Sequence, residues 1–197
     1  MTESSVLDIL LGPASFAYIK RKVTQAESDE VRRLMDASKL RGVHMQREFD
    51  RTYPEETLAS HILGIVDVDN AGLEGLELVF DEMLSPSVTD SEMDIIYGDQ
   101  VFLTIDVNIQ FMAEKLARET REEHDADSTT ILVMDAKSGD FLAHASAPDF
   151  NPNVYNNVPP ANRTNRPAVS AYEPGSVFKI FSIASMLEVG DINQHSL

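Results

Sequence analysis

Ser176 and Lys179 have the side-chain types and the spacing of a nucleophile and its base. Residues three apart on a helix lie on the same face, so the hydroxyl and the amine would be neighbours. A serine hydroxyl is a weak nucleophile unless a nearby group takes its proton, and a lysine accepts a proton only when neutral. Burial among apolar side chains would favour the neutral amine. Alternatively, Ser176 is only a helix N-cap and Lys179 a surface lysine.

The residues around this pair predict a helix that begins just before the serine. Pro174 and Gly175 interrupt any preceding element, and an apolar run at 177–189 follows and ends at Gly190. We therefore expect one buried helix with Ser176 in its first turn. No other serine in the chain has a lysine three residues after it.

Several segments resemble one known family. Glu-Pro-Gly-Ser-x-x-Lys at 173–179 resembles the first active-site motif of the class B penicillin-binding proteins, in particular the division-type peptidoglycan D,D-transpeptidases. Serine β-lactamases share its Ser-x-x-Lys element. Three earlier segments resemble, in the family's order, the non-catalytic pedestal that precedes the catalytic domain: Arg51-Thr52-Tyr53-Pro54, Ala59-Ser60-His61-Ile62-Leu63-Gly64 and Gly72-Leu73-Glu74-Gly75-Leu76-Glu77.

The fold class that this resemblance implies is α+β. We expect a mixed pedestal of the dimerisation type over residues 1–90. The beginning of an α/β/α-sandwich transpeptidase domain, of the penicillin-binding protein and β-lactamase kind, is expected over residues 98–197, truncated. The polar stretch 85–98, with Pro86 and Gly98, is the expected join between the two.

The pedestal residues predict a few short elements. Thr24-Gln25-Ala26-Glu27 is a capping-box pattern and opens a helix whose end is marked by Gly42. Polar and apolar residues then alternate at 43–49, which favours a strand. A short helix or strand at 58–64, a glycine-rich loop and another short helix ending near Leu84 complete the module.

The catalytic part is expected to begin with a short strand at 101–104 and a helix capped by Asp106. The inner face of this helix carries apolar side chains at helical spacing: Ile109, Met112, Ala113, Leu116 and Ala117. Charged residues are expected to form its solvated outer face: Glu114, Lys115, Arg118, Glu119, Arg121, Glu122 and Glu123.

A strand hairpin is predicted next, with strands at 129–136 and 141–147. The turn at 137–140 contains Gly139, where a positive φ is expected. Residues 131–134 are all apolar, so we expect helices to cover both faces of the sheet, one from before the hairpin and one from after it.

The Asn- and Pro-rich loop 148–167 lies just before the serine. Long ordered loops next to catalytic residues often shape a cleft, and Arg163 and Arg166 could hold a carboxylate of a bound peptide. The alternatives are an ordinary surface connection or glycosylation of Asn162.

The composition excludes several classes of function. Lys and Arg total 16 against 33 Asp and Glu, which gives a net charge of −17 and argues against nucleic acid or an anionic membrane surface as partner. There is no cysteine, and no cofactor or metal is expected, because the histidines have no paired metal spacing and are interpreted as structural. They are His44, His61, His124, His144 and His195. No apolar stretch reaches the ~18 residues of a membrane span, so the chain is expected to be cytosolic or a fragment.

The resemblance implies D,D-transpeptidation of peptidoglycan stem peptides through an acyl-enzyme on Ser176, with Lys179 as base. It also implies covalent capture of β-lactams by Ser176. Divisome membrane proteins and a glycosyltransferase are the implied partners, and a single-pass membrane anchor with the domains outside the cytoplasm is the implied location. The anchor is absent from this chain, so we expect it to be part of a longer enzyme.

The family's other two active-site motifs are not found where they are needed. Neither a Ser-x-Asn loop nor a Lys-Thr-Gly or Lys-Ser-Gly strand is expected before or after Ser176. The chain therefore carries half an active site and is expected to be inactive alone. A non-catalytic divisome scaffold and a serine β-lactamase or β-lactam sensor remain as alternatives.

Overall fold

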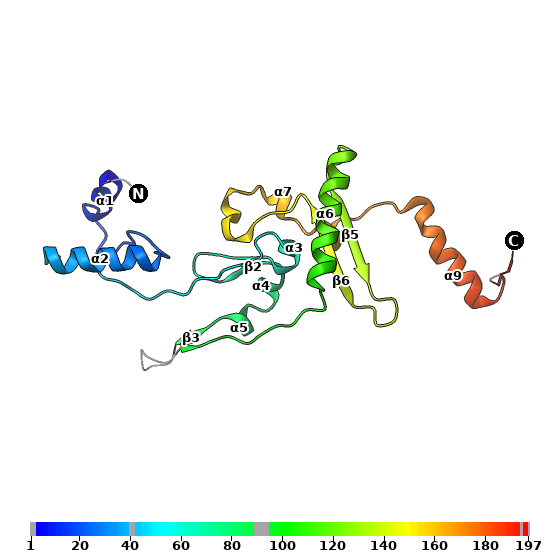
Figure 1. The fold of residues 1–197 in the computed structure, drawn as a ribbon, viewed down its shortest axis with the longest axis horizontal. Coiled ribbons are helices and arrows are strands. Elements are labelled where there is room, and N and C mark those ends of the chain that lie inside the picture. The colour runs from blue at the N-terminus through cyan, green and yellow to red at the C-terminus, as the bar shows by residue number, and fades with distance from the viewer. Residues whose placement is uncertain (1–2, 40–41, 89–94, 194, 197) are drawn as a thin grey trace.

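The computed structural model describes residues 3–39, 42–88, 95–193 and 195–196 of the chain. It is an elongated α+β molecule whose parts follow one another along the long axis (Figure 1). Helices α1 (Glu3–Leu10) and α2 (Gln25–Ser38) lie at one end, and helix α9 (Lys179–Val189) lies at the other. The elements between them form the pedestal core and a helix packed on a strand hairpin.

Helix α2 begins as its sequence predicts. The Thr24 side chain accepts a hydrogen bond from the backbone N–H of Glu27, and the Glu27 carboxylate accepts one from the N–H of Thr24, which completes the capping box. The predicted end at Gly42 is wrong. The helix ends at Ser38 with Lys39 as a left-handed C-cap at φ 50°, which stops the helix before the chain reaches the glycine.

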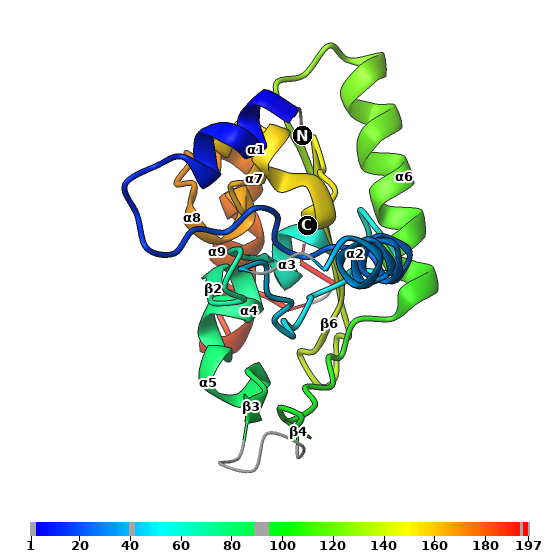
Figure 2. The ribbon, with the colours of Figure 1, turned by 90° about the vertical axis from the view of Figure 1, so that its left-hand side faces the viewer.

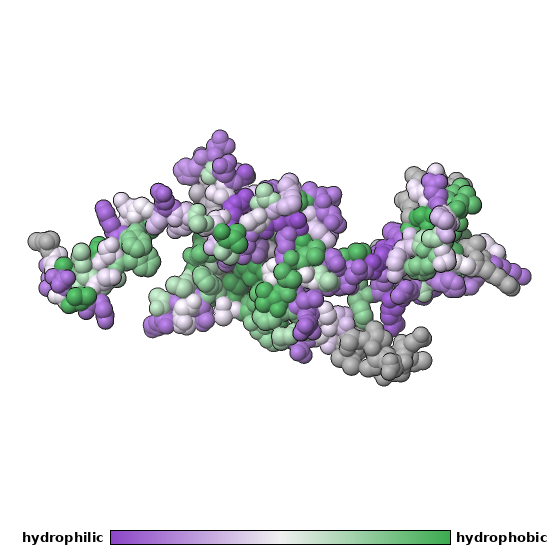
Figure 3. Space-filling model, turned by 180° about the vertical axis from the view of Figure 1, so that it is seen from behind, coloured by the Kyte–Doolittle hydropathy of each residue, from purple (hydrophilic) through white to green (hydrophobic). Residues whose placement is uncertain are grey.

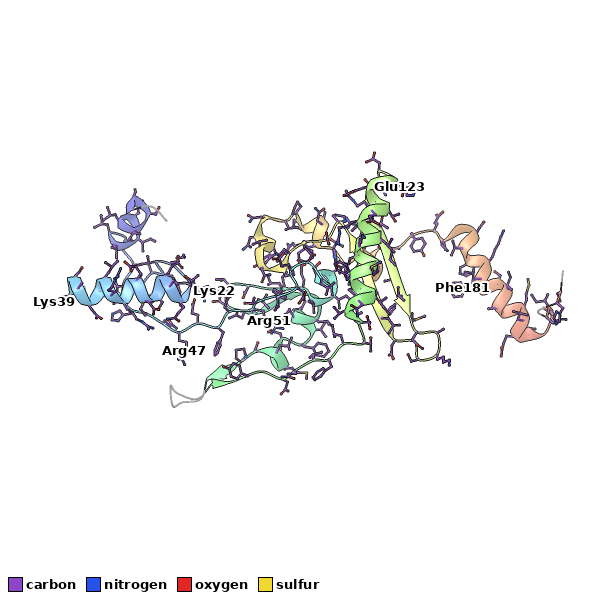
Figure 4. All side chains as sticks on the ribbon, in the orientation of Figure 1. Lys22, Lys39, Arg47, Arg51, Glu123 and Phe181 are labelled. Atoms are coloured by element: carbon purple, nitrogen blue, oxygen red, sulfur yellow. The ribbon has the colours of Figure 1, made fainter. Side chains whose placement is uncertain are left out.

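The strand predicted at 43–49 is also wrong. This stretch is extended but no described strand pairs with it, and an alternating pattern without a partner strand does not make a sheet. Side-chain contacts, rather than a strand pair, connect the segment before α2 to residues 48–70 of the pedestal. Arg21 donates to Glu48 at 2.7 Å and to Asp69 at 2.6 Å, and Lys22 donates to Asn70 at 2.9 Å (Lys22 is labelled in Figure 4).

The pedestal core is small and tightly packed. It contains α3 (Ser60–Leu63), an antiparallel pair of β1 (Ile65–Val66) and β2 (Gly72–Glu74), and the short helices α4 (Gly75–Val79) and α5 (Asp81–Leu84). Helix α5 ends at Leu84 as predicted, and Ile65 is fully buried. Gly64 has φ 84°, and a Cβ there would lie 1.8 Å from the carbonyl oxygen of Glu74, so only glycine lets β1 leave α3 at this point.

The expected join at 85–98 is not a direct link. Its residues 89–94 lie outside the described part of the chain. The rest forms an antiparallel pair of β3 (Ser87–Val88) and β4 (Ile95–Ile96), after which the N–H of Asp99 donates to the carbonyl of Met83 at 2.7 Å. The chain therefore leaves the end of α5 and returns to it before it continues to the next part.

Helix α6 (Val107–Glu123) packs on the hairpin of β5 (Thr129–Met134) and β6 (Phe141–Ala147), as expected. The Asp106 carboxylate caps the helix by accepting hydrogen bonds from the N–H groups of Asn108 and Ile109 at 2.9 and 3.0 Å. The core between helix and strands consists of small side chains surrounded by larger ones: Ala113, Ala143 and Ala145, with Ile109, Ile131 and Val133. Viewed down the long axis, α6 lies on one side of the molecule, and α4 and α5 lie on the other (Figure 2).

The strand predicted at 101–104 is absent. This segment touches β6 through two hydrogen bonds, from the Thr104 hydroxyl to the carbonyl of Phe141 at 2.7 Å and from the N–H of Asp106 to the carbonyl of Leu142 at 2.9 Å. These contacts hold the start of α6 against the hairpin without continuing into a backbone ladder. Among the described residues, the sheet of β5 and β6 therefore has no third strand.

The face of the hairpin away from α6 is covered only in part within the described residues, because Ser146 is 3% exposed and His144 contacts Asn165 but the rest of this face is open. The expectation of helices covering both faces is therefore wrong here. Leu132 and Met134, on the face away from α6, are 47% and 56% exposed. Helix α9, expected to cover them, follows the short 3-10 helix η2 (Gly175–Phe178) at the far end of an extended stretch (Figure 1).

The burial predicted for the apolar run 177–189 is likewise wrong in this chain. The helix forms and ends at Gly190 in a left-handed C-cap, but none of its residues is buried. Phe181 stands away from α6 and the hairpin in Figure 4, and apolar side chains gather on the surface of this end in Figure 3. The reason is geometric, because the extended stretch 170–174 carries the helix away from the hairpin that it was expected to cover (Figure 1).

Candidate functional site

Ser176 and Lys179 lie on consecutive turns at the start of one helical segment. Ser176 is in η2, directly after Gly175, and Lys179 is the first residue of α9. The N–H of Lys179 donates to the carbonyl of Ser176, so η2 runs into α9 without a break. Ser176 therefore lies in the first turn, at the positive end of the helix dipole. No hydrogen bond joins the two side chains within the described residues.

The apolar surroundings expected for the lysine are not assembled. Lys179 is exposed, and so are its neighbours Phe178 and Phe181, at 55% and 64%. The two phenyl rings lie 5.4 Å apart between centroids and contact each other rather than enclosing the amine. The structure thus provides the spacing of the candidate pair but not the burial.

Lys137-Ser138-Gly139 has the letters of the family's Lys-Ser-Gly motif but not its expected setting. These residues form the hairpin turn between β5 and β6, with Gly139 at φ 82° as predicted. The Asp135 carboxylate accepts hydrogen bonds from the N–H groups of Ser138 and Lys137 at 2.9 and 2.8 Å, and these bonds hold the pKa of Asp135 below its ordinary value. The triplet is therefore part of a turn and lies before the serine, not on a strand after it.

The loop before the serine is docked on the pedestal. It contains η1 (Pro152–Asn157), α7 (Pro160–Arg163) and α8 (Arg166–Val169). The side-chain amide of Asn153 pairs with both backbone groups of Tyr53, and the His61 ring donates to the carbonyl of Asn162 at 3.0 Å. The side chain of Asn165 donates to the carbonyl of His61 at 3.3 Å. Two of the three pedestal motifs therefore hold the loop that leads to the serine.

Arg163 and Arg166 are used within the fold. The Arg163 guanidinium forms an ion pair with Glu74 at 3.1 Å and lies 5.5 Å from the ring centroid of Tyr155. Arg166 donates to the carbonyl of Ala161 at 2.9 Å. Glu74 belongs to the third pedestal motif, so this motif also contacts the loop. The hypothesis of a carboxylate-binding pair gains no support from these contacts.

The prediction for α6 is wrong at three residues: Met112 and Leu116, expected on its inner face, are 50% and 47% exposed, whereas Glu114 is buried. Glu114 was expected on the solvated face of α6, yet it is 5% exposed, and its carboxylate accepts hydrogen bonds from the N–H of Ala59 and from Gln110, both at 2.7 Å. Burial raises the pKa of Glu114 above its ordinary value, more than these hydrogen bonds lower it. The available signal was the spacing of Gln110 and Glu114, four residues apart beside the apolar stripe.

Gln110 extends this contact to the strand hairpin. It is fully buried, and its side chain donates to the carbonyl of His144 at 3.0 Å and accepts from the N–H of His144 at 2.7 Å. The side-chain amide of Gln110 therefore makes the two hydrogen bonds that a neighbouring strand would make with His144 on β6. A continuous polar path runs from Ala59 in the pedestal through Glu114 and Gln110 to His144.

In the pedestal, His61 contacts the loop that follows β6. His61 is 5% exposed, and its ring packs edge-on against Phe150, with centroids 5.3 Å apart. Burial lowers the pKa of His61 below its ordinary value, so the neutral ring is favoured. The structural role expected for His61 and His144 agrees with these contacts. Among the described residues, no group of three or more metal-ligating side chains is arranged around a common point.

A hollow of about 300 Å³ lies in the pedestal, away from the candidate pair. It is bordered by Phe49, Leu84 and Tyr97, with Asp81 and Asp99 beside them. Neither Ser176 nor Lys179 lines it, so it is not the site of the expected chemistry.

Two family models match the chain. The penicillin-binding protein dimerisation domain matches residues 12–95, and the penicillin binding protein transpeptidase domain matches residues 129–197. A curated relative from Pseudomonas aeruginosa, the probable peptidoglycan D,D-transpeptidase PbpC, is 32% identical over 92% of this chain and 34% of its own length. Stage V sporulation protein D of Bacillus subtilis is 31% identical over 98% of this chain and 32% of its own. The chain thus spans about a third of the length of these relatives.

Solved structures give the same picture. Crystal structures of penicillin binding protein 3 from Mycobacterium tuberculosis, in the apo form and complexed with ampicillin, are 33% identical to this chain. Each superposes on 71% of this chain and 31% of its own with a TM-score of 0.64. A peptidoglycan synthetase from Bifidobacterium adolescentis is 25% identical over 90% of this chain and 34% of its own, with a TM-score of 0.61.

Proposed function

This chain belongs to the class B penicillin-binding proteins, and from that premise we propose that it provides the pedestal and the nucleophile segment of a peptidoglycan D,D-transpeptidase. One observation carries the proposal above all. Ser176 and Lys179 open a helix inside the residues that match the transpeptidase model, after a pedestal that matches the dimerisation model. The division into residues 1–90 and 98–197 is part of the same proposal.

Ser176 would act as the nucleophile. Its Oγ attacks the carbonyl carbon of the penultimate D-Ala of a stem peptide while the neutral Nζ of Lys179 takes the hydroxyl proton. The bond to the terminal D-Ala breaks, the leaving amine takes up a proton, and an acyl-enzyme ester remains on Ser176. The amine of a neighbouring stem peptide then attacks this ester and forms the cross-link.

The helix start supports the charge that develops during this reaction. The N–H of Ser176 lies in the first turn, where backbone donors have no partner within the helix. It is proposed as one donor to the oxyanion, and the helix dipole has the sign that favours this negative charge. A β-lactam would acylate Ser176 by opening of its ring: the bond between Oγ and the carbonyl carbon forms, the ring C–N bond breaks, and the nitrogen takes up a proton and stays attached to the acyl group.

Partners and location follow the same proposal. We assign divisome membrane proteins and a glycosyltransferase as partners, and a single-pass anchor that places both domains outside the cytoplasm. None of the helices in the described part of the chain is long and apolar enough to cross a membrane. A membrane-fractionation experiment on the full-length gene product, with protease accessibility from outside the cytoplasm, tests this location.

The function is tested by labelling the full-length gene product with a fluorescent penicillin. Wild type should form one stable adduct, Ser176→Ala should form none, and Lys179→Ala should acylate roughly 10²- to 10⁴-fold more slowly because it lacks the base. Ser182→Ala, a serine on the same exposed helix, is the matched control and should label normally. An adduct that persists in Ser176→Ala would overturn the proposal.

Two further readouts separate the alternatives. Continuous hydrolysis of the penicillin, in place of a lasting adduct, would favour a β-lactamase or a sensor. Full-length wild type that binds divisome proteins but never labels would favour a non-catalytic scaffold. The 197-residue chain alone is expected to release no D-Ala from stem peptides, because the other two motifs are needed for the site.

A further inference from the structure

The side chain of Asn165 lies where three parts of the molecule meet. Its amide nitrogen donates to the carbonyl of His61 in the pedestal helix α3 at 3.3 Å. Its amide oxygen lies 2.9 Å from Nε2 of His144 on β6 and accepts the proton of that ring nitrogen. The backbone of Asn165 starts α8, because its carbonyl accepts the N–H groups of Ala168 and Val169 at 3.0 and 3.2 Å. One residue therefore links the pedestal, the hairpin and the segment that runs to Ser176.

Other contacts of the loop reach only one of these parts. Asn153, Asn162 and Arg163 bond to the pedestal, through Tyr53, His61 and Glu74. At the start of the loop, Asp149 bonds to Arg118 on α6. Within the described residues 150–176, Asn165 alone has a side chain hydrogen-bonded to the hairpin.

No later contact fixes the chain before the serine. The residues from Ala168 to Ser176 are exposed, and among residues 167–176, all of them described, no side chain is hydrogen-bonded to the pedestal or to the hairpin. The direction in which the segment leaves the folded body is therefore set at α8. The contact with His144 ties this part of the loop to the sheet, and the contact with His61 ties it to the pedestal.

We infer, on the basis of the transpeptidase function proposed above, that Asn165 is a positioning residue for Ser176. It fixes the nucleophile segment in register with the catalytic sheet through His144 and with the pedestal through His61. Asn165 itself does not touch the reacting atoms. Small misplacements of a reacting group cost large factors in rate, so the loss of this register should appear in the chemical step.

The test measures penicillin acylation of the full-length gene product and separates the noncovalent binding constant from the acylation rate constant. Asn165→Ala should lower the acylation rate constant about 10- to 100-fold and leave the noncovalent constant within about twofold. Asn156→Ala is the matched control, because Asn156 is exposed on the same loop, and it should acylate like wild type. Circular dichroism and thermal unfolding confirm that each variant is folded.

A second variant distinguishes the two contacts. Asn165→Asp keeps an acceptor oxygen for His144 but has no donor for the carbonyl of His61, so it should acylate faster than Asn165→Ala. Equal losses in both variants would contradict the role of the sheet contact. An unchanged rate constant in Asn165→Ala, with only a lower melting temperature, would show a purely structural role and overturn the inference. Wild type that forms no adduct would instead refute the proposed function, so the two failures are distinguishable.

Discussion

The side-chain amide of Asn153 pairs with both backbone polar groups of Tyr53, a hundred residues earlier in the chain. Its oxygen accepts the N–H of Tyr53 at 2.9 Å, and its nitrogen donates to the carbonyl of Tyr53 at 2.9 Å. Tyr53 is 7% exposed and belongs to the Arg-x-Tyr-Pro motif. The pedestal motif thus acts by presenting its backbone to a loop of the catalytic part.

Replacing Asn153 with alanine should destabilise the junction between the pedestal and the loop. The N–H of Tyr53 would lose its acceptor in a largely buried position, which costs about 1–3 kcal/mol. Urea unfolding should show this loss, and hydrogen exchange of the Tyr53 amide should become faster. Asn156→Ala on the same short helix serves as control, and an equal effect of both substitutions would contradict the assignment.

The ion pair between Arg163 and Glu74 should be detectable in a double-mutant cycle. The Arg163 side chain is 14% exposed and that of Glu74 is 37% exposed, so the pair is partly shielded from water. We expect a coupling free energy of about 0.5–1 kcal/mol between Arg163→Ala and Glu74→Ala, measured by urea unfolding. Additive effects would show that the two charges do not interact. The coupling should weaken at high salt.

Two glycines with similar backbone angles provide a matched pair. Gly64 and Gly139 have φ of 84° and 82°, but a Cβ on Gly64 would lie 1.8 Å from the carbonyl oxygen of Glu74, whereas one on Gly139 would meet nothing within 4 Å. Gly139→Ala should cost about 1–2 kcal/mol, the strain of the left-handed conformation alone. Gly64→Ala should cost clearly more, and circular dichroism with urea unfolding measures both. Equal losses would mean that α3 and β2 do not approach this closely.

Stability should depend on pH through Glu114. Its pKa in the folded protein is raised above the ordinary 4.5 by burial, so between these two values the folded state binds more protons than the unfolded state. The contribution of Glu114 to the free energy of unfolding should therefore fall as the pH rises from about 4.5 through the folded pKa, and this contribution should stay constant above it. Glu114→Gln should remove this contribution.

Carboxyl-carbon NMR measures the same effect directly. The Glu114 signal should titrate with a midpoint above 4.5, and a midpoint at or below this value would contradict the burial of a charged group between α6 and Ala59. Urea unfolding of wild type and Glu114→Gln at several pH values then shows whether this carboxyl accounts for the slope.

The local elements of the chain were predictable because short-range chemistry decides them. The capping box at Thr24, the Asp106 cap, the turn at Gly139 and the C-cap at Gly190 all formed as expected. Each depends on a hydrogen bond or a backbone angle within a few residues, so the local sequence contains the information. The candidate pair, Ser176 and Lys179, belongs to the same class, since its spacing along one helix is a local property.

The tertiary structure decided which of these elements pair and which side chains are buried. The alternating stretch at 43–49 has no partner strand among those described, and the apolar residues of α9 are exposed because the extended chain before it leads away from the sheet. Glu114 is buried where the pedestal packs against α6, and there its carboxylate accepts the N–H of Ala59, 55 residues earlier in the chain. Such contacts join residues far apart in the chain, and no local pattern encodes their distance. The sequence by itself therefore determined the helix that holds the serine and lysine, whereas only the tertiary structure placed the pedestal motifs on the loop before it.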